Sequence, residues 1–127
     1  MSTDPTPPAL PRNFMRPCVL LLLREESAHG YDLLERLKPF GFTRDDPGRL
    51  YRTLRALETE GLVRSGWESS QQGPDRRIYE LTRHGMEHLH EDVKLLVGAR
   101  DVLNAFLGRF EEFVAVDGGQ AVRAGRR

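Results

Sequence analysis

The amino-acid sequence predicts a mainly α-helical protein with one small β-hairpin, arranged as a winged helix-turn-helix domain followed by a long C-terminal dimerisation helix. Two patterns predict this fold class. Three short helical segments precede a pair of alternating segments joined by a polar turn, and a long segment with heptad-like spacing follows them. The corresponding divisions are a disordered N-terminal arm at 1–13, the winged helix domain at 14–82, the dimerisation helix at 83–114 and a flexible tail at 115–127.

Length and composition restrict the class of protein. A chain of 127 residues favours one domain with a modest core. Lys and Arg total 19, as do Asp and Glu, so the net charge neither supports nor excludes a polyanionic partner. The only cysteine, Cys18, cannot form an internal disulfide, which fits a reducing cytoplasmic location. The longest strongly apolar run, 19–23, is too short to cross a bilayer, so neither a membrane segment nor a secretory signal is predicted.

The first two helices are predicted from residues that begin and end helices. Pro17 suits the first turn of a helix that continues through 18–25. Ser27 is predicted to cap a second helix at 28–41, which Gly41 helps to stop. The buried stripe expected for this second helix consists of Leu33, Leu34 and Leu37.

The third helix is predicted at 47–60. Asp46 is the expected N-cap, and Pro47 is the expected first helical residue, where its missing N–H costs nothing. Gly61 is expected to end the helix, because glycine takes a positive φ without strain.

This third helix has one apolar side and one cationic side. At about 100° per residue, its leucines fall on one stripe: Leu50, Leu54 and Leu57. The side facing away from them carries Gly48, Arg52 and Arg55, and the flanks carry Arg49 and Tyr51. Acidic residues gather at the two ends of the helix, so the middle of its outer side is cationic.

Two alternating strands follow, at 62–68 and 76–82, joined by a polar turn. Three helices followed by a hairpin is the order of a winged helix-turn-helix, whose third helix enters the DNA major groove. Guanidinium groups can hydrogen bond to guanine edges or pair with phosphates. Arg76 and Arg77 lie at the expected wing tip. Exposed arginines are often merely solvated, but the whole pattern favours double-stranded DNA as a partner.

The last predicted helix carries a second apolar pattern. From Met86 to Val114, apolar residues recur in alternating steps of three and four, interrupted at Arg100. So small a domain cannot cover a helix this apolar, and a second copy of the same helix is the expected partner, with folding back onto the first helix as the alternative. The residues assigned to this homodimer interface are Leu89, Val93, Leu96, Leu103, Phe106, Leu107 and Phe110.

Three motifs resemble those of the PadR family of bacterial transcription regulators. They are His-Gly-Tyr at 29–31, Pro-Gly-x-Leu-Tyr-x-x-Leu at 47–54 and Arg-x-Tyr-x-Leu-Thr at 77–82, within a match that spans about 15–89. The resemblance implies a homodimeric winged-helix repressor of the short type, which binds a pseudo-palindromic operator through its third helix and wing.

The resemblance also assigns residues to the DNA surface. It implies that Tyr31 lies near the phosphates, that Tyr51 and Arg52 belong to the recognition helix, and that Arg76 and Arg77 belong to the wing. Together with the helix pattern, it gives the complete set of predicted DNA-binding residues: Tyr31, Gly48, Arg49, Tyr51, Arg52, Arg55, Arg76 and Arg77.

Other kinds of site have weaker support. Trp67 is expected to anchor the core or an interface, and the resemblance adds the hypothesis that it contacts a small apolar or aromatic effector. His84 and His88, four positions apart on one helical face, could hold a metal ion if a third ligand joined them. The alternative functions are therefore a metal-responsive sensor and a winged helix that binds only protein. No catalytic arrangement or cofactor motif is visible, so neither an enzyme nor a cofactor is predicted.

Overall fold

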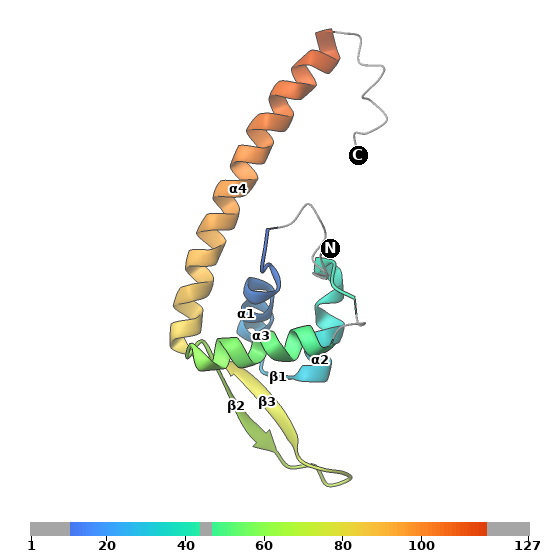
Figure 1. Cartoon of the computed structure of the whole chain (residues 1–127), viewed down its shortest axis with the longest axis vertical. Helices are drawn as coiled ribbons and strands as arrows, with labels where there is room; N and C mark the ends of the chain where they lie inside the picture. The colour runs from blue at the N-terminus through green and yellow to red at the C-terminus, as the bar shows by residue number, and fades with distance from the viewer. Residues whose placement is uncertain (1–10, 44–46, 117–127) are drawn as a thin grey trace. The chain divides into compact units, whose positions relative to one another are not determined.

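The computed structural model describes residues 11–43 and 47–116 (Figure 1). In chain order its elements are α1 (Met15–Glu25), β1 (Ala28–His29), α2 (Gly30–Arg36), the short 3-10 helix η1 (Lys38–Phe40), α3 (Pro47–Thr59), β2 (Val63–Glu68), β3 (Arg76–Leu81) and α4 (Arg83–Val116). The chain divides into two compact units, Met1–Asp92 and Val93–Arg127, and α4 contributes residues to both. The predicted fold class, mainly helical with a small antiparallel sheet, is confirmed.

The sheet has one strand more than the predicted hairpin. Its order is β1-β3-β2, with both neighbouring pairs antiparallel. Ala28 and His29 pair with Tyr79 and Ile78 of β3, which keeps the chain extended until Gly30. The prediction that Ser27 caps the second helix is therefore wrong: the N-cap position is His29, and no side chain bonds there.

The predicted ends of α3 agree with the structure where it describes them. Pro47 is the first helical residue. Gly61 has a φ of 80°, and its N–H donates to the Glu58 carbonyl at 3.0 Å, which closes the last turn. Gly41 likewise adopts a left-handed conformation, with φ 96°, directly after η1.

Three predictions fall wholly or mostly outside the described residues. They are the Asp46 cap, the N-terminal arm up to residue 10, and the tail from residue 117 onward. The tail was expected to begin at residue 115, but α4 continues through Val116.

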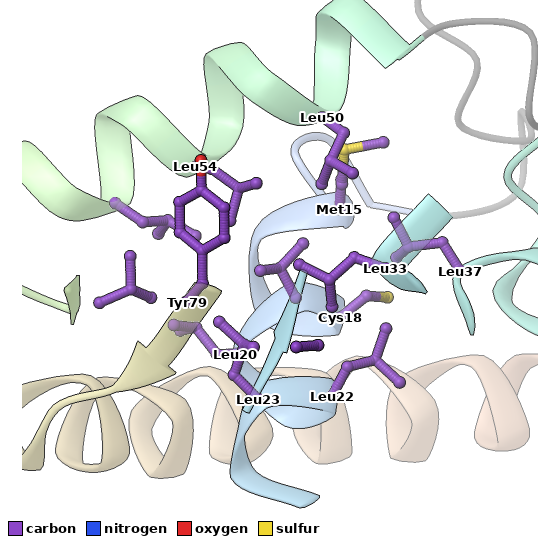
Figure 2. Close-up of a cluster of buried hydrophobic side chains, with 14 of the residues drawn as sticks. Met15, Cys18, Leu20, Leu22, Leu23, Leu33, Leu37, Leu50, Leu54 and Tyr79 are labelled. Carbon is purple, nitrogen blue, oxygen red and sulfur yellow. The ribbon is translucent and has the colours of Figure 1, made fainter. Parts of the chain in front are cut away.

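The core of the first unit is built mainly from aliphatic side chains of α1, α2, α3 and the sheet, joined by Leu89 of α4 (Figure 2). Leu50 and Leu54 of α3 point toward Met15 of α1 and Tyr79 of β3, and Leu57 is also fully buried. The predicted leucine stripe of α3 is confirmed, and it fixes which side of the helix faces outward.

Two close contacts of glycines lock elements together. The Tyr51 ring lies against Gly30, where an added Cβ would overlap its hydroxyl and ring atoms. Gly85, in the first turn of α4, lies against the Leu62 carbonyl in the same way. Thr82 strengthens this junction, because its hydroxyl accepts the Gly85 N–H at 2.9 Å and donates to the Leu62 carbonyl at 3.0 Å.

One residue of the predicted dimer interface belongs to the core instead. Leu89 is only 5% exposed and packs in the hydrophobic cluster of the first unit. Its assignment to the interface is wrong, because the first turns of α4 bury their apolar face against the same chain.

The second unit presents apolar side chains to solvent. Leu103 is 57% exposed and Leu96 is half-buried. The exposed large apolar side chains of this part of α4 are Val93, Leu95, Val97, Val102, Leu103, Phe106, Leu107, Phe110 and Phe113. None of the helices formed by residues 11–43 and 47–116 has both the length and the apolar content needed to span a membrane.

Candidate nucleic-acid interface

The outer side of α3 carries the predicted arginines. Gly48, Arg52 and Arg55 are all exposed, because the leucine stripe turns the opposite side of the helix inward. Within the described residues, neither Arg52 nor Arg55 forms an ion pair. Both guanidinium groups are therefore available to an external anion or base edge.

A groove of about 390 Å³ runs along one flank of α3, beside the start of α1. We call it the α1 groove; its polar lining comes from Asn13, Arg16, Arg49, Arg52 and Thr53. Arg49 is half-buried there, on the predicted flank of the helix. Arg16 donates two hydrogen bonds to the Glu60 carboxylate, at 2.7 and 3.1 Å, and these bonds lower the pKa of Glu60 below its usual 4.5.

A smaller pocket of about 220 Å³ lies on the other flank of α3, against the sheet. We call it the wing pocket; it is lined by Tyr51, Arg55, Glu58, Arg77 and Tyr79. Tyr51 is exposed at its rim, whereas Tyr79 is buried, and burial raises the pKa of the Tyr79 hydroxyl. The outer side of α3 thus has a hollow on each flank.

A chain of contacts joins the wing to α3. The Ser65 hydroxyl donates to the Glu58 carboxylate at 2.7 Å and accepts from the Arg77 Nε at 3.0 Å. The Arg77 guanidinium also lies over the Trp67 ring, 5.1 Å from its centroid. Arg76 and Arg77, both predicted to bind DNA, are both exposed, but the Arg77 guanidinium group has partners within the wing.

Trp67 does not occupy the core. Its side chain is 66% exposed, and its described ring partner is Arg77. The expectation that it anchors the core is wrong, since the wing extends beyond the helices that could cover it (Figure 1). Its roles at an interface or with an effector stay predictions.

The other face of the wing is tied to the second helix. The His29 ring nitrogens lie 2.7 Å from the Glu68 carboxylate of β2 and 3.4 Å from Asp32 of α2. Tyr31, two residues after His29, is exposed on the first turn of α2, as a residue near phosphates must be. Both faces of the wing are therefore fixed to the helices by polar contacts.

The two histidines of the metal hypothesis face different carboxylates. His84 lies 3.8 Å from Glu87, and His88 lies 3.8 Å from Asp92. Across residues 11–43 and 47–116, no group of three or more His, Cys, Asp or Glu side chains could hold a metal ion together. The third ligand that this hypothesis requires is not supplied by the described part of the chain.

Three residues of this surface were not predicted from the sequence: Arg16, Glu58 and Ser65. Arg16 and its partner are 44 positions apart, so no local pattern connects them. Glu58 offered a weak signal, because it falls on the same helical flank as Tyr51, facing the wing.

These observations define a winged-helix DNA-binding fold. The chain belongs to a family described as "Transcriptional regulator PadR-like family", which matches residues 19–91. Transcriptional regulator Rv3488 of Mycobacterium tuberculosis is 38% identical over 97 residues, which cover 72% of this chain and 89% of that protein. The predicted family is confirmed, and so is the prediction of a regulator rather than an enzyme.

Solved structures of other family members share the fold. A PadR family transcriptional regulator from Eggerthella lenta is 30% identical, with a TM-score of 0.66, over 76% of this chain and 83% of that one. Bacillus subtilis PadR, solved in complex with operator DNA, is 25% identical with a TM-score of 0.56; the match covers 62% of this chain and 46% of that one.

Proposed function

We propose that this PadR-family regulator is a homodimeric repressor that binds a pseudo-palindromic operator, with α3 in the major groove of each half-site. The observation that carries the proposal is the outer side of α3, where Arg52 and Arg55 are exposed and form no ion pair within the described residues. Packing against the core explains the leucines on the inner side of α3. It does not explain why the outer side carries arginines, whose guanidinium groups can hydrogen bond to base edges.

The complex of Bacillus subtilis PadR with operator DNA supports this use of the fold. In a complex with DNA, the exposed side of α3 would contact base edges. The residues around it would contact phosphates. Arg76 is the wing residue we assign to the backbone. Arg77 of β3 contacts Ser65 and Trp67 of β2, so its guanidinium group joins the two strands of the wing.

The exposed face of α4 supports the homodimer. At about 100° per residue, its exposed apolar side chains from Val93 to Phe113 occupy roughly 220° of the helix circumference. A contiguous apolar surface of this kind on a small protein marks an interface. Because the arc is wider than a two-helix seam, we expect each α4 to pack against more than one helix of a second copy. Two copies would then present α3 to half-sites about one helical turn, ~34 Å, apart.

The test begins with DNA fragments that the parent protein selects from its source genome. Arg52→Ala and Arg55→Ala should each weaken binding to the selected operator by roughly 1–3 kcal/mol, and should relax the preference for one base position. Arg24→Ala is the matched control, because Arg24 is an exposed arginine of α1 with no contact assigned to DNA. Operator affinity that is unchanged in the double variant Arg52→Ala/Arg55→Ala would refute the assignment of α3.

The direction of regulation needs its own measurement. We expect operator sites to overlap a promoter and the protein to lower transcript yield from it in vitro. An increase in yield with bound protein would leave DNA binding intact and show an activator instead.

A further inference from the structure

The two flanks of α3 differ in the charge of their lining, because the wing pocket includes the Glu58 carboxylate and the described lining of the α1 groove includes no acidic residue. In the wing pocket, the Arg77 guanidinium is tied to Ser65 and stacked on Trp67. In the α1 groove, the guanidinium groups of Arg16, Arg49 and Arg52 line one hollow, and none of the described residues that line it is acidic. Such a concentration of one charge inside a hollow favours an anion.

The size of the major groove determines what must lie beside α3. A helix with its side chains is about 10–12 Å across, and the major groove is about 12 Å wide. A helix that enters it therefore has the phosphates of one strand on each flank. The wing pocket faces one strand, and the α1 groove faces the other.

Asn13 and Arg16 are positioned relative to each other by the backbone. Asn13 adopts a left-handed conformation with φ 58°, and its carbonyl accepts the Arg16 N–H at 3.1 Å. This turn brings an amide side chain and a guanidinium group to the same hollow. Both groups donate hydrogen bonds of the kind that phosphate oxygens accept.

Glu60 is the internal competitor for this site. Its carboxylate takes both guanidinium hydrogen bonds of Arg16 in the absence of DNA. The side chains of both residues reach solvent, so a phosphate can approach the same guanidinium group. Glu60 therefore reduces, but does not abolish, the anion affinity of the groove.

We infer that the α1 groove is a phosphate-binding subsite for the operator strand on the side of α3 opposite the wing, with Arg16 as its principal ligand and Glu60 as the anion that Arg16 releases. This inference rests on the proposed function. It adds Arg16 and Asn13 of the α1 side to the DNA surface and gives Glu60 a role that opposes binding.

The first test compares two arginines of one helix. Arg16→Ala should weaken binding to all DNA sequences to a similar degree and reduce the slope of log affinity against log salt by roughly one. Arg24→Ala removes the same charge from the other end of α1 and should leave the slope unchanged. Equal slopes for both variants and the parent would overturn the inference.

The second test removes Glu60 from the same ion pair. Glu60→Gln frees the Arg16 guanidinium and should tighten DNA binding by about two- to fivefold, the range expected for a surface ion pair. Glu80→Gln is the matched control, since Glu80 is 45% exposed against 46% for Glu60 and also pairs with an arginine, Arg64. Arg16→Ala and Glu60→Gln break one contact with opposite effects on DNA binding, so a loss of folding cannot produce both results.

Two further outcomes separate the possible failures. If Arg52→Ala weakens operator binding while Arg16→Ala and Glu60→Gln match their controls, the groove assignment fails and the proposed function stands. If the parent binds no DNA, both fail. Inorganic phosphate, titrated by NMR, tests a small-anion role: binding that Arg16→Ala abolishes, together with unchanged DNA affinity, would overturn the assignment to the DNA backbone.

Discussion

The two units of this chain use similarly spaced apolar side chains with different results. In the first unit, Leu50, Leu54 and Leu57 of α3 are buried against α1, α2 and the sheet. In the second unit, Leu103, Phe106 and Phe110 of α4 are exposed. Helical periodicity establishes that a helix has an apolar face, but it does not establish which chain covers that face.

The change occurs within one helix and within one step of its pattern. Leu89 is 5% exposed, whereas Val93, the next position of the seam, is 45% exposed. The boundary between the units falls between these residues. The apolar side chains of one repeat therefore pack into the core of their own chain before the boundary. Beyond it, as we propose, they pack against a second copy.

The largest effect is expected from a charge at the exposed face of α4. Leu103→Asp should convert the dimer to a monomer in sedimentation velocity, because the carboxylate would be buried without a partner in the interface. Operator affinity should fall with it, since each monomer holds only one half-site. Sedimentation as a dimer would place the interface on another surface.

A cavity in the first unit should produce a different kind of damage. Leu54→Ala should lower the free energy of unfolding by about 2–5 kcal/mol, because Leu54 is fully buried in the core. Cys18 reports on this core, since its thiol is buried and burial raises its pKa from 9.0 to about 12.

Alkylation of Cys18 then distinguishes the two units. The thiol should stay protected in Leu103→Asp and should react faster in Leu54→Ala, with the logarithm of the rate rising in proportion to the loss in free energy of unfolding. Rapid alkylation in monomeric Leu103→Asp would mean that the first unit cannot fold without its partner, and the contrast between the two units would be lost.

The smallest effect concerns acid stability. The Arg16 hydrogen bonds lower the pKa of Glu60 in the folded protein, so the stabilisation is complete above pH 4.5 and is lost as the pH falls through the lower folded value. Between about pH 5 and pH 2, the parent should lose more stability than Glu60→Gln, by no more than about 1 kcal/mol for so exposed a pair. Identical pH profiles in chemical denaturation would show that this pair adds nothing to folding.

Local patterns predicted the elements well where one helix or turn carries the signal. Pro47 and Gly61 mark the ends of α3, and its leucines and arginines lie on the expected sides. The two alternating segments and the polar turn between them predicted the wing correctly as a hairpin at nearly the right residues. The short strand β1 was missed, because two residues carry no periodicity and only pairing with Tyr79 and Ile78 makes them a strand.

Local patterns could not predict contacts between residues that are far apart in the chain. Trp67 was expected to anchor the core or an interface, yet its ring is exposed and lies beneath Arg77, so it is not part of the core. Arg77 was assigned to DNA by its place in the wing, although its guanidinium group has partners within the chain. A side chain's partners depend on how elements pack, and the spacing of residues within one element does not encode that packing.

The sequence by itself determined that α3 is amphipathic, that its outer side is cationic, and that a long apolar helix follows the wing, because each property follows from the geometry of a single helix. Only the tertiary structure decided which cations are held internally, which carboxylate competes for Arg16, and where along α4 the protein's own core stops. Those outcomes depend on distances between segments that are far apart in the chain, and hydrogen bonds and ion pairs form only where folding brings such segments within a few ångströms.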